Sequence, residues 1–180
     1  FEDQSKLKTG QNIKYDSLVL KKVGINIEGV CFDTMVAAHL INPSAKSISL
    51  DTLSIEYFNY EVVPILDLIG RGKNQISLGE VPIEKVAFYA SEYTDLVFQL
   101  TKILKKKLKE KKLFKYFNKI ELPLIKVLIQ MEFTGTFVDV NLLKKMSEDI
   151  GEKLGLITYS IYSLAGKEFN INSTQQLATI

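Results

Sequence analysis

The chain of 180 residues has few cysteines, no long apolar run and almost no charge imbalance. Its one cysteine, Cys31, excludes an intramolecular disulfide and argues against a cysteine-based zinc site. It lies in an apolar stretch that is typical of a small buried side chain, which fits a reducing, intracellular compartment. No segment approaches the roughly 20 apolar residues of a membrane-spanning helix. A formal charge of +2 does not by itself indicate a nucleic-acid partner.

The chain also lacks an initiator methionine and has only one histidine. The first residues, from Phe1, contain no initiator methionine and no signal-peptide pattern. We therefore expect a chain that was cut from a longer protein. The only histidine, His39, has no visible partner for catalysis or metal binding, so we expect it to have a structural role.

Hydrophobic periodicity predicts a mainly helical chain with one strand that enters the core. Helices are expected over residues 12–23, 35–41, 49–57, 83–112, 120–133 and 141–164, and the strand over residues 25–32. Asp33 or Thr34 is a candidate N-cap for the second helix. Residues 61–75 are expected to form a loop or a broken segment, because they contain proline and two glycines. Residues 113–117 are expected to form a short apolar hinge.

Short segments spread along the whole chain carry a family resemblance. They are Gly10-Gln-Asn-Ile-Lys-Tyr-Asp16, Phe32-Asp-Thr-Met35, Leu50-Asp-Thr-Leu53, Asp67-Leu-Ile-Gly70, Tyr89-Ala90, Ile120-Glu-Leu-Pro-Leu124, Ala165-Gly-Lys-Glu-Phe-Asn170 and Asn172-Ser-Thr with Gln176-Leu177. Each segment is weakly specific alone, but their order and spacing together are specific. The chain resembles the family A DNA polymerases, the bacterial DNA polymerase I type, over nearly its whole length.

The resemblance implies an α/β fold and two domains. Residues 1–116 would form the later part of a ribonuclease H-like 3′→5′ exonuclease domain. Residues 117–180 would form the helical start of the polymerase domain, which leads into the thumb. It also implies that the carboxylate pair that opens the exonuclease site lies before Phe1, and that the polymerase motifs lie beyond Ile180. Neither reaction is therefore expected of these 180 residues alone.

The resemblance also implies a function for the longer protein. It would be a DNA-directed DNA polymerase of replication and repair. Its partners would be primer–template DNA, a single-stranded 3′ end and dNTPs, and it would act as a monomer without a membrane. Mg²⁺ or Mn²⁺ would be the cofactor of the complete enzyme, weakly bound or absent in this fragment. Its location would be the bacterial cytoplasm, in association with the nucleoid.

The exonuclease of the family hydrolyses a frayed 3′ end with two divalent ions, which prefer Asp and Glu oxygens. Asp16 matches the family's second motif, and the resemblance gives it a metal-binding and catalytic role. Asn12 lies one helical turn earlier on the same face. The resemblance suggests that Asn12 positions the DNA end or Asp16, and a helix cap is an equally good alternative. Tyr89 matches the tyrosine that orients the attacking water.

The third motif departs from the family pattern, which has a tyrosine, three residues and then a metal-binding aspartate. Tyr93 stands where that aspartate is expected. At about 100° per residue, Asp95 would face away from Tyr89, whereas Glu92 would lie within about 60° of it. Glu92 is therefore the better candidate for a replacement metal ligand. Because a two-metal site that loses a ligand loses charge stabilisation, we expect proofreading to be weak or absent.

Alternatives remain open. The exonuclease site would be active if Glu92 or another acid completes it. The chain would instead be a non-catalytic module that binds DNA or a partner if no polymerase is attached. The lysine-rich end of the helix at 83–112 either contacts DNA phosphates or, as is more usual, forms the solvated end of a helix.

Overall fold

The sheet of this computed structural model, which describes residues 1–180, consists of two short parallel strands. Strand β1 (Lys8–Gly10) pairs with β2 (Val30–Asp33), and helix α1 (Ile13–Lys21) connects them. The strand predicted over residues 25–32 is therefore shorter than expected and begins later. Gly24 and Gly29 have φ angles of 83° and 72°, so the backbone before β2 turns twice and is not extended.

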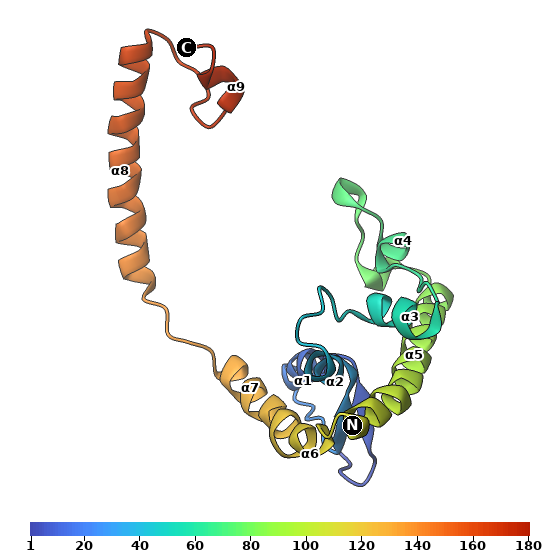
Figure 1. Cartoon of the computed structure of the whole chain (residues 1–180). Coiled ribbons are helices and arrows are strands. Elements are labelled where there is room, and N and C mark those ends of the chain that lie inside the picture. The colour runs from blue at the N-terminus through green and yellow to red at the C-terminus, as the bar shows by residue number, and fades with distance from the viewer. The chain divides into compact units, whose positions relative to one another are not determined.

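The core lies where the long helix α5 (Ile83–Glu110) packs against β1, α2 (Thr34–Ile41) and α3 (Leu50–Phe58), as Figure 1 shows for α3 and α5. Every fourth residue of α5 is apolar over three turns, which gives the helix one continuous buried face. Those residues are Leu96, Leu100, Leu104 and Leu108. The segment predicted to be broken contains helix α4 (Ile65–Ile69) and the 3₁₀ turn η1 (Gly72–Asn74), and a second 3₁₀ turn, η2 (Leu78–Glu80), follows it.

Residues 113–117 do not form the predicted hinge. Helix α6 (Phe114–Tyr116) continues into the π-helical turn η3 (Phe117–Glu121) and then into α7 (Leu122–Thr134). Phe117 is completely buried, and its ring centroid lies 4.9 Å from that of Phe32 in β2. The apolar run was predicted as a hinge because its burial partner lies more than 80 residues earlier in the chain and is not visible in the local pattern.

Helix α7 packs against α1. Lys126 Nζ lies 2.8 Å from Glu28 Oε2, and Lys14 forms a second ion pair, with Glu132. Ile125 is 6% exposed beneath these polar contacts. The first compact unit therefore extends from Phe1 to Gly135. The family domain boundary at residues 116–117 stays a prediction, because packing does not define family domains.

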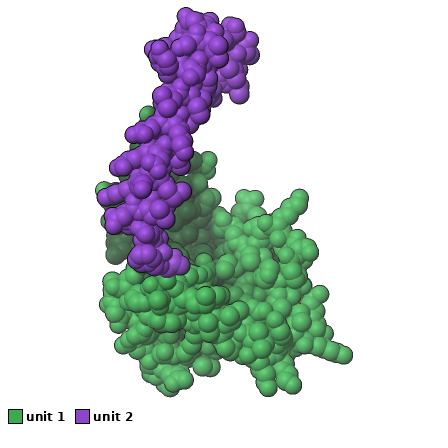
Figure 2. Space-filling view, turned by 90° about the vertical axis from the view of Figure 1, so that its left-hand side faces the viewer, with its two compact units in different colours: residues 1–135 green, residues 136–180 purple.

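The second compact unit comprises residues 136–180 and is coloured purple in Figure 2. Helix α8 (Val140–Ala165) begins at Asp139, whose side chain accepts a hydrogen bond from Leu142 N at 2.9 Å. It continues through both internal glycines. A turn then leads to α9 (Thr174–Leu177). Tyr162 Oη closes this turn by donating a hydrogen bond to the Phe169 carbonyl. In neither unit is there a helix of the length and apolar character that crossing a membrane requires.

Candidate functional site

Asp16 lies in the first turn of α1, and a buried carboxylate fixes the start of that helix. Asp33, at the end of β2, is 1% exposed. Its Oδ2 accepts a hydrogen bond from Ile13 N at 2.7 Å, and its Oδ1 accepts one from Val36 N at 3.0 Å. Asp33 therefore caps α1 and α2 together, which confirms it as the N-cap of the second helix and sets the position of Asp16.

A second buried network fixes the turn between β1 and α1. Gln11 is 8% exposed, and its Nε2 donates to the Ile48 carbonyl at 2.9 Å. The Thr34 hydroxyl lies 3.0 Å from the Gly10 carbonyl and 2.5 Å from Gln11 Oε1. Buried polar groups of this kind are costly when they are unpaired, so the network specifies one conformation of the turn. Gln11 therefore has a structural role in its motif.

Asn12 occupies the N-cap position of α1 in the left-handed conformation, with φ 59° and ψ 47°. Asparagine tolerates this conformation better than most residues. Its side chain makes no capping hydrogen bond, because the Asp33 carboxylate fills that role. The alternative in which the Asn12 side chain caps the helix is therefore not what the structure shows. Its role in positioning DNA or Asp16 stays a prediction.

Asp16 is one of the residues that line a surface pocket of about 420 Å³, most of which belong to α1 and β1. Much of the Asp16 surface is exposed. Partial burial nevertheless raises the pKa of its carboxyl above the ordinary value, and the negative charge of Asp33 raises it further. The two carboxylates therefore act on each other electrostatically, and a cation near Asp16 would relieve their repulsion.

Tyr89 and Tyr93 lie one turn apart on α5, with ring centroids 6.2 Å apart and ring planes tilted by 41°. Tyr93 packs against the hydrophobic core and is half-buried. Burial raises the pKa of the Tyr93 phenol to about 12, with smaller contributions from the negative charges of Tyr89, Asp16, Asp51 and Asp33. Tyr93 therefore lies within electrostatic range of the Asp16 carboxylate. At neutral pH the phenol is protonated and contributes no negative charge there.

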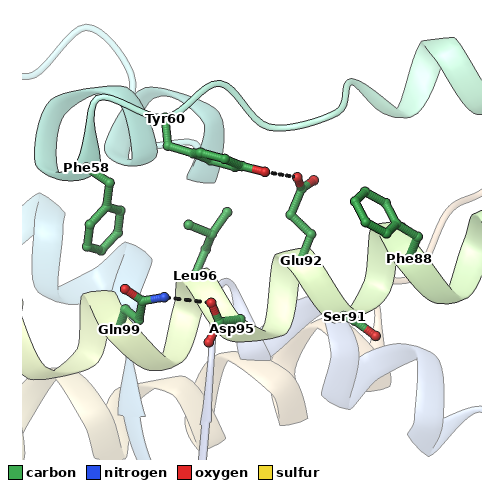
Figure 3. A pocket seen from close by; sticks show the side chains of 8 residues that line it. All are labelled: Phe58, Tyr60, Phe88, Ser91, Glu92, Asp95, Leu96 and Gln99. Atoms are coloured by element: carbon green, nitrogen blue, oxygen red, sulfur yellow. Dashed lines mark hydrogen bonds between the residues drawn. The ribbon is translucent and has the colours of Figure 1, made fainter.

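Glu92 is bound to the segment that follows α3. Its Oε1 accepts a hydrogen bond from Tyr60 Oη at 2.5 Å, and its Oε2 accepts one from Val63 N at 3.1 Å. Figure 3 shows Glu92 reaching toward Tyr60 across a pocket of about 480 Å³, with Asp95 paired to Gln99 on the same helix. Both oxygens of Glu92 are therefore occupied. Its role as a replacement metal ligand stays a prediction, and these bonds count against it.

Asp51 is a further acidic residue near the tyrosine pair, and it was not among the candidates from the sequence. It lies exposed in the first turn of α3. Burial raises the pKa of the Tyr89 phenol, and the negative charges of Asp51 and Glu92 raise it further, so Asp51 acts electrostatically on the tyrosine pair. The segment Leu50-Asp-Thr-Leu53 contributed to the family resemblance, but its spacing gave no indication that Asp51 faces α5. A search for acidic residues inside the resembling segments would have found it.

The divalent metal that the resemblance implies needs several oxygen ligands. No three His, Cys, Asp or Glu side chains among residues 1–180 come close enough together to hold a metal ion. Asp16 is available, Asp33 already accepts hydrogen bonds from two helix starts, and Tyr93 is neutral. The donor set of these residues does not fit a two-metal site.

The parallel strand pair, the crossover helix that carries Asp16 and the long helix α5 with its tyrosine pair form an α/β domain. Residues 1–109 match the family model described as 3′-5′ exonuclease, and the chain belongs to this family. The resemblance to DNA polymerases of the polymerase I type that the sequence indicated is confirmed.

The similarity to known proteins extends beyond residues 1–109. DNA polymerase I of Pseudomonas aeruginosa is 36% identical over 182 residues, which cover 99% of this chain and 20% of the relative. DNA polymerase I of Borreliella burgdorferi is 38% identical over 180 residues, which cover 100% of this chain and 19% of the relative. The chain thus spans about a fifth of the length of these curated relatives.

A solved structure supports the fold. The POL domain of Pol1 from M. smegmatis, in complex with DNA primer–template and dNTP, superposes with a TM-score of 0.73 at 23% identity. The match covers 98% of this chain and 27% of that chain. The predicted α/β fold class is therefore confirmed.

Proposed function

We propose that this chain is part of a DNA-directed DNA polymerase whose 3′→5′ exonuclease-like domain has lost most or all of its proofreading activity and supports the polymerase structurally. The relatives named DNA polymerase I support the first part of the proposal, because they align with the chain from end to end. The substrates of the complete protein would be primer–template DNA and dNTPs, with Mg²⁺ or Mn²⁺ as cofactor. It would act as a monomer in the bacterial cytoplasm, near the nucleoid.

The observation that carries the loss of proofreading is the neutral Tyr93, four residues after Tyr89 on α5. In the family pattern this position holds an aspartate that binds metal. A phenol whose pKa is about 12 cannot replace the charge of a carboxylate at neutral pH. Because the charges around a metal site stabilise the transition state, the loss of one ligand is expected to reduce the rate by about 100-fold or more.

The packing of the domain supports a structural role. Phe117 and Ile125 bury the connection to α7 in the same unit as the exonuclease-like residues. The ion pairs of Lys14 and Lys126 with Glu132 and Glu28 lie on the surface of that contact. An exonuclease-like domain packed in this way stabilises α7 even without catalysis.

The test is digestion of a 3′-labelled single strand by the complete natural protein with Mg²⁺ or Mn²⁺ and without nucleotides. We expect the wild type and Asp16→Ala to be equally inactive. Tyr93→Asp should gain digestion, whereas the matched neutral variant Tyr93→Asn should not, because only the first restores the ligand charge. Primer extension by every variant serves as the control for folding.

Two results would contradict the proposal. If the wild type digests the strand and Asp16→Ala abolishes the digestion, proofreading has survived and Glu92→Ala is the next variant to measure. If the complete protein does not extend a primer on a template with dNTPs, the polymerase assignment is wrong, and a non-catalytic binding module becomes the better explanation.

A further inference from the structure

The second half of α5 and the turns after it concentrate positive charge. Residues 102–119 contain nine lysines and one acidic residue, Glu110, and so carry a charge of +8. The whole chain carries +2, which leaves −6 on all other residues together. Charge is therefore strongly segregated along the chain, although its total is nearly balanced.

Four of these lysines form a stripe on the outer face of α5. They are Lys102, Lys105, Lys106 and Lys109, and all four are exposed. Pairs of them that are three or four residues apart lie on a single helix face, opposite the buried leucines of the same turns. The stripe is about 10 Å long at 1.5 Å per residue. We call these four residues the basic stripe.

Local stabilisation does not explain the basic stripe. Lys106 is its only member with an ion pair, to Glu110 at 3.9 Å, and both side chains are exposed. Like charges four residues apart destabilise a helix. The favourable effect of cations on the helix dipole is confined to the last turn, and Lys102 and Lys105 lie before it. Ion pairing and the helix dipole therefore do not offset the repulsion within the stripe.

Aromatic rings hold three of these ammonium groups at the surface. Lys102 Nζ lies 4.5 Å from the ring centroid of Phe98, which is 55% exposed. Lys105 and Lys109 lie 5.7 and 5.4 Å from the ring centroid of Phe114. Cation–π contacts of this kind restrict the lysine side chains, so less conformational freedom would be lost when an anion binds.

We propose that the basic stripe binds the sugar–phosphate backbone of DNA, outside the exonuclease-like site. A row of ammonium groups complements a polymer that carries negative charges at regular intervals. The choice of DNA over another polyanion rests on the proposed function. Tyr93 packs against the core on the inner side of α5, whereas the stripe faces outward, so DNA held there would not occupy the Asp16 site.

The test compares two quadruple variants of the complete natural protein that have the same net charge. One replaces the stripe (K102Q, K105Q, K106Q and K109Q). The matched control replaces four exposed lysines elsewhere on the first unit (K6Q, K22Q, K46Q and K85Q). Fluorescence anisotropy measures binding to a labelled duplex and to a labelled single strand of equal length over a range of NaCl concentrations. Circular dichroism verifies that both variants are folded.

We expect the stripe variant to bind DNA about tenfold more weakly at low salt, whereas the control stays within about twofold of the wild type. If the stripe neutralises about three phosphates, its replacement should make the plot of log K against log salt concentration shallower by about 2 to 3. Weaker binding of either DNA form supports the proposal, and the form whose affinity decreases more is the one that the stripe binds.

Three results would overturn the proposal. Equal decreases in both variants would mean that overall charge, and not the stripe, determines binding. Wild-type binding by the stripe variant would mean that these lysines are only solvated. Weaker binding of poly-glutamate without weaker binding of DNA would indicate an acidic polypeptide as the partner. Failure of the wild type to extend a primer would reject the proposed polymerase function and leave the binding comparison valid.

Discussion

The carboxylate of Asp33 accepts a hydrogen bond from the backbone N–H of Ile13 at 2.7 Å, across 20 residues of sequence. Its other oxygen accepts from Val36 N in the next helix. One buried side chain at the end of β2 therefore caps the N-termini of two helices. It also fixes the turn that presents Asn12 and Asp16. The position of the candidate site depends on a residue that does not itself belong to it.

Removal of this side chain should loosen both helix starts. Asp33→Ala leaves two buried N–H groups without acceptors, so we expect a local loss of about 2–4 kcal/mol. Hydrogen exchange measured by mass spectrometry on the complete protein should show faster exchange in peptides from residues 12–21 and 34–41. Asp139→Ala, which removes the cap of α8, is the matched control and should leave those two peptides unchanged. Wild-type protection in the Asp33 variant would contradict the double-cap role.

The same residue predicts a pH dependence. Burial raises the pKa of the Asp33 carboxyl above its ordinary value of 3.8, although four backbone hydrogen bonds act in the opposite direction. The folded state therefore binds this proton more tightly than the unfolded state does. The part of the stability that comes from binding this proton is fully present below pH 3.8 and is lost as the pH rises through the raised folded pKa.

Asp33→Asn isolates this effect, because the variant cannot titrate at that position. The local free energy of opening of α1 and α2, wild type minus variant, should decrease as the pH rises from about 4 to 7. Hydrogen exchange at a series of pH values, corrected for intrinsic rates, measures that difference. A difference that grows with pH would show that the hydrogen bonds, and not burial, determine the direction of the pKa shift of the Asp33 carboxyl.

The Glu92 carboxylate is predicted to hold residues 60–63 against α5. Glu92→Ala removes the acceptor of both Tyr60 Oη and Val63 N, so that segment should exchange a few-fold faster and be cut more readily by proteases. Tyr60→Phe removes one of the two bonds and should show a smaller effect. If Glu92→Ala instead abolishes digestion of single-stranded DNA by the complete protein, Glu92 is a metal ligand after all.

The ion pair between Glu28, which precedes β2, and Lys126 of α7 predicts a charge-swap result. Glu28→Lys and Lys126→Glu should each speed hydrogen exchange in α7 by a small factor, because surface ion pairs contribute little. The double swap restores the attraction and should return the exchange rate toward that of the wild type. High salt should reduce the differences. A double variant that behaves as the sum of the two single variants would show that this pair is not coupled.

The local hydrophobic pattern was sufficient to predict most helices, but it was insufficient to predict the structure of the residues between them. The apolar spacing of Leu96, Leu100 and Leu104 defined α5 without any knowledge of its neighbours. The hinge prediction at residues 113–117 was wrong because Phe117 is buried by Phe32, a partner that periodicity cannot reveal. Strand β1 was not predicted at all. Three residues are too short for a hydrophobic pattern, and pairing with β2 alone makes them a strand.

For the candidate site too, some features follow from the sequence and others only from the tertiary structure. The order of the resembling segments determined the family, and it also selected Asp16, Tyr89 and the substitution at Tyr93 as site candidates, whose roles stay predictions. Charge counting along the chain located the lysine-rich end of α5. Each of these is a property of residue identity and spacing, so the sequence alone is sufficient for it.

Only the tertiary structure determined which groups act together. It brought Asp33 to the start of α1, Asp51 to the tyrosine pair, and Glu92 to Tyr60 and Val63. Helical angles placed Glu92 near Tyr89, but they could not show that another segment would occupy both of its oxygens. The physical reason is that hydrogen bonds and electrostatic shifts depend on distances between segments, and those distances are set by burial of the common core.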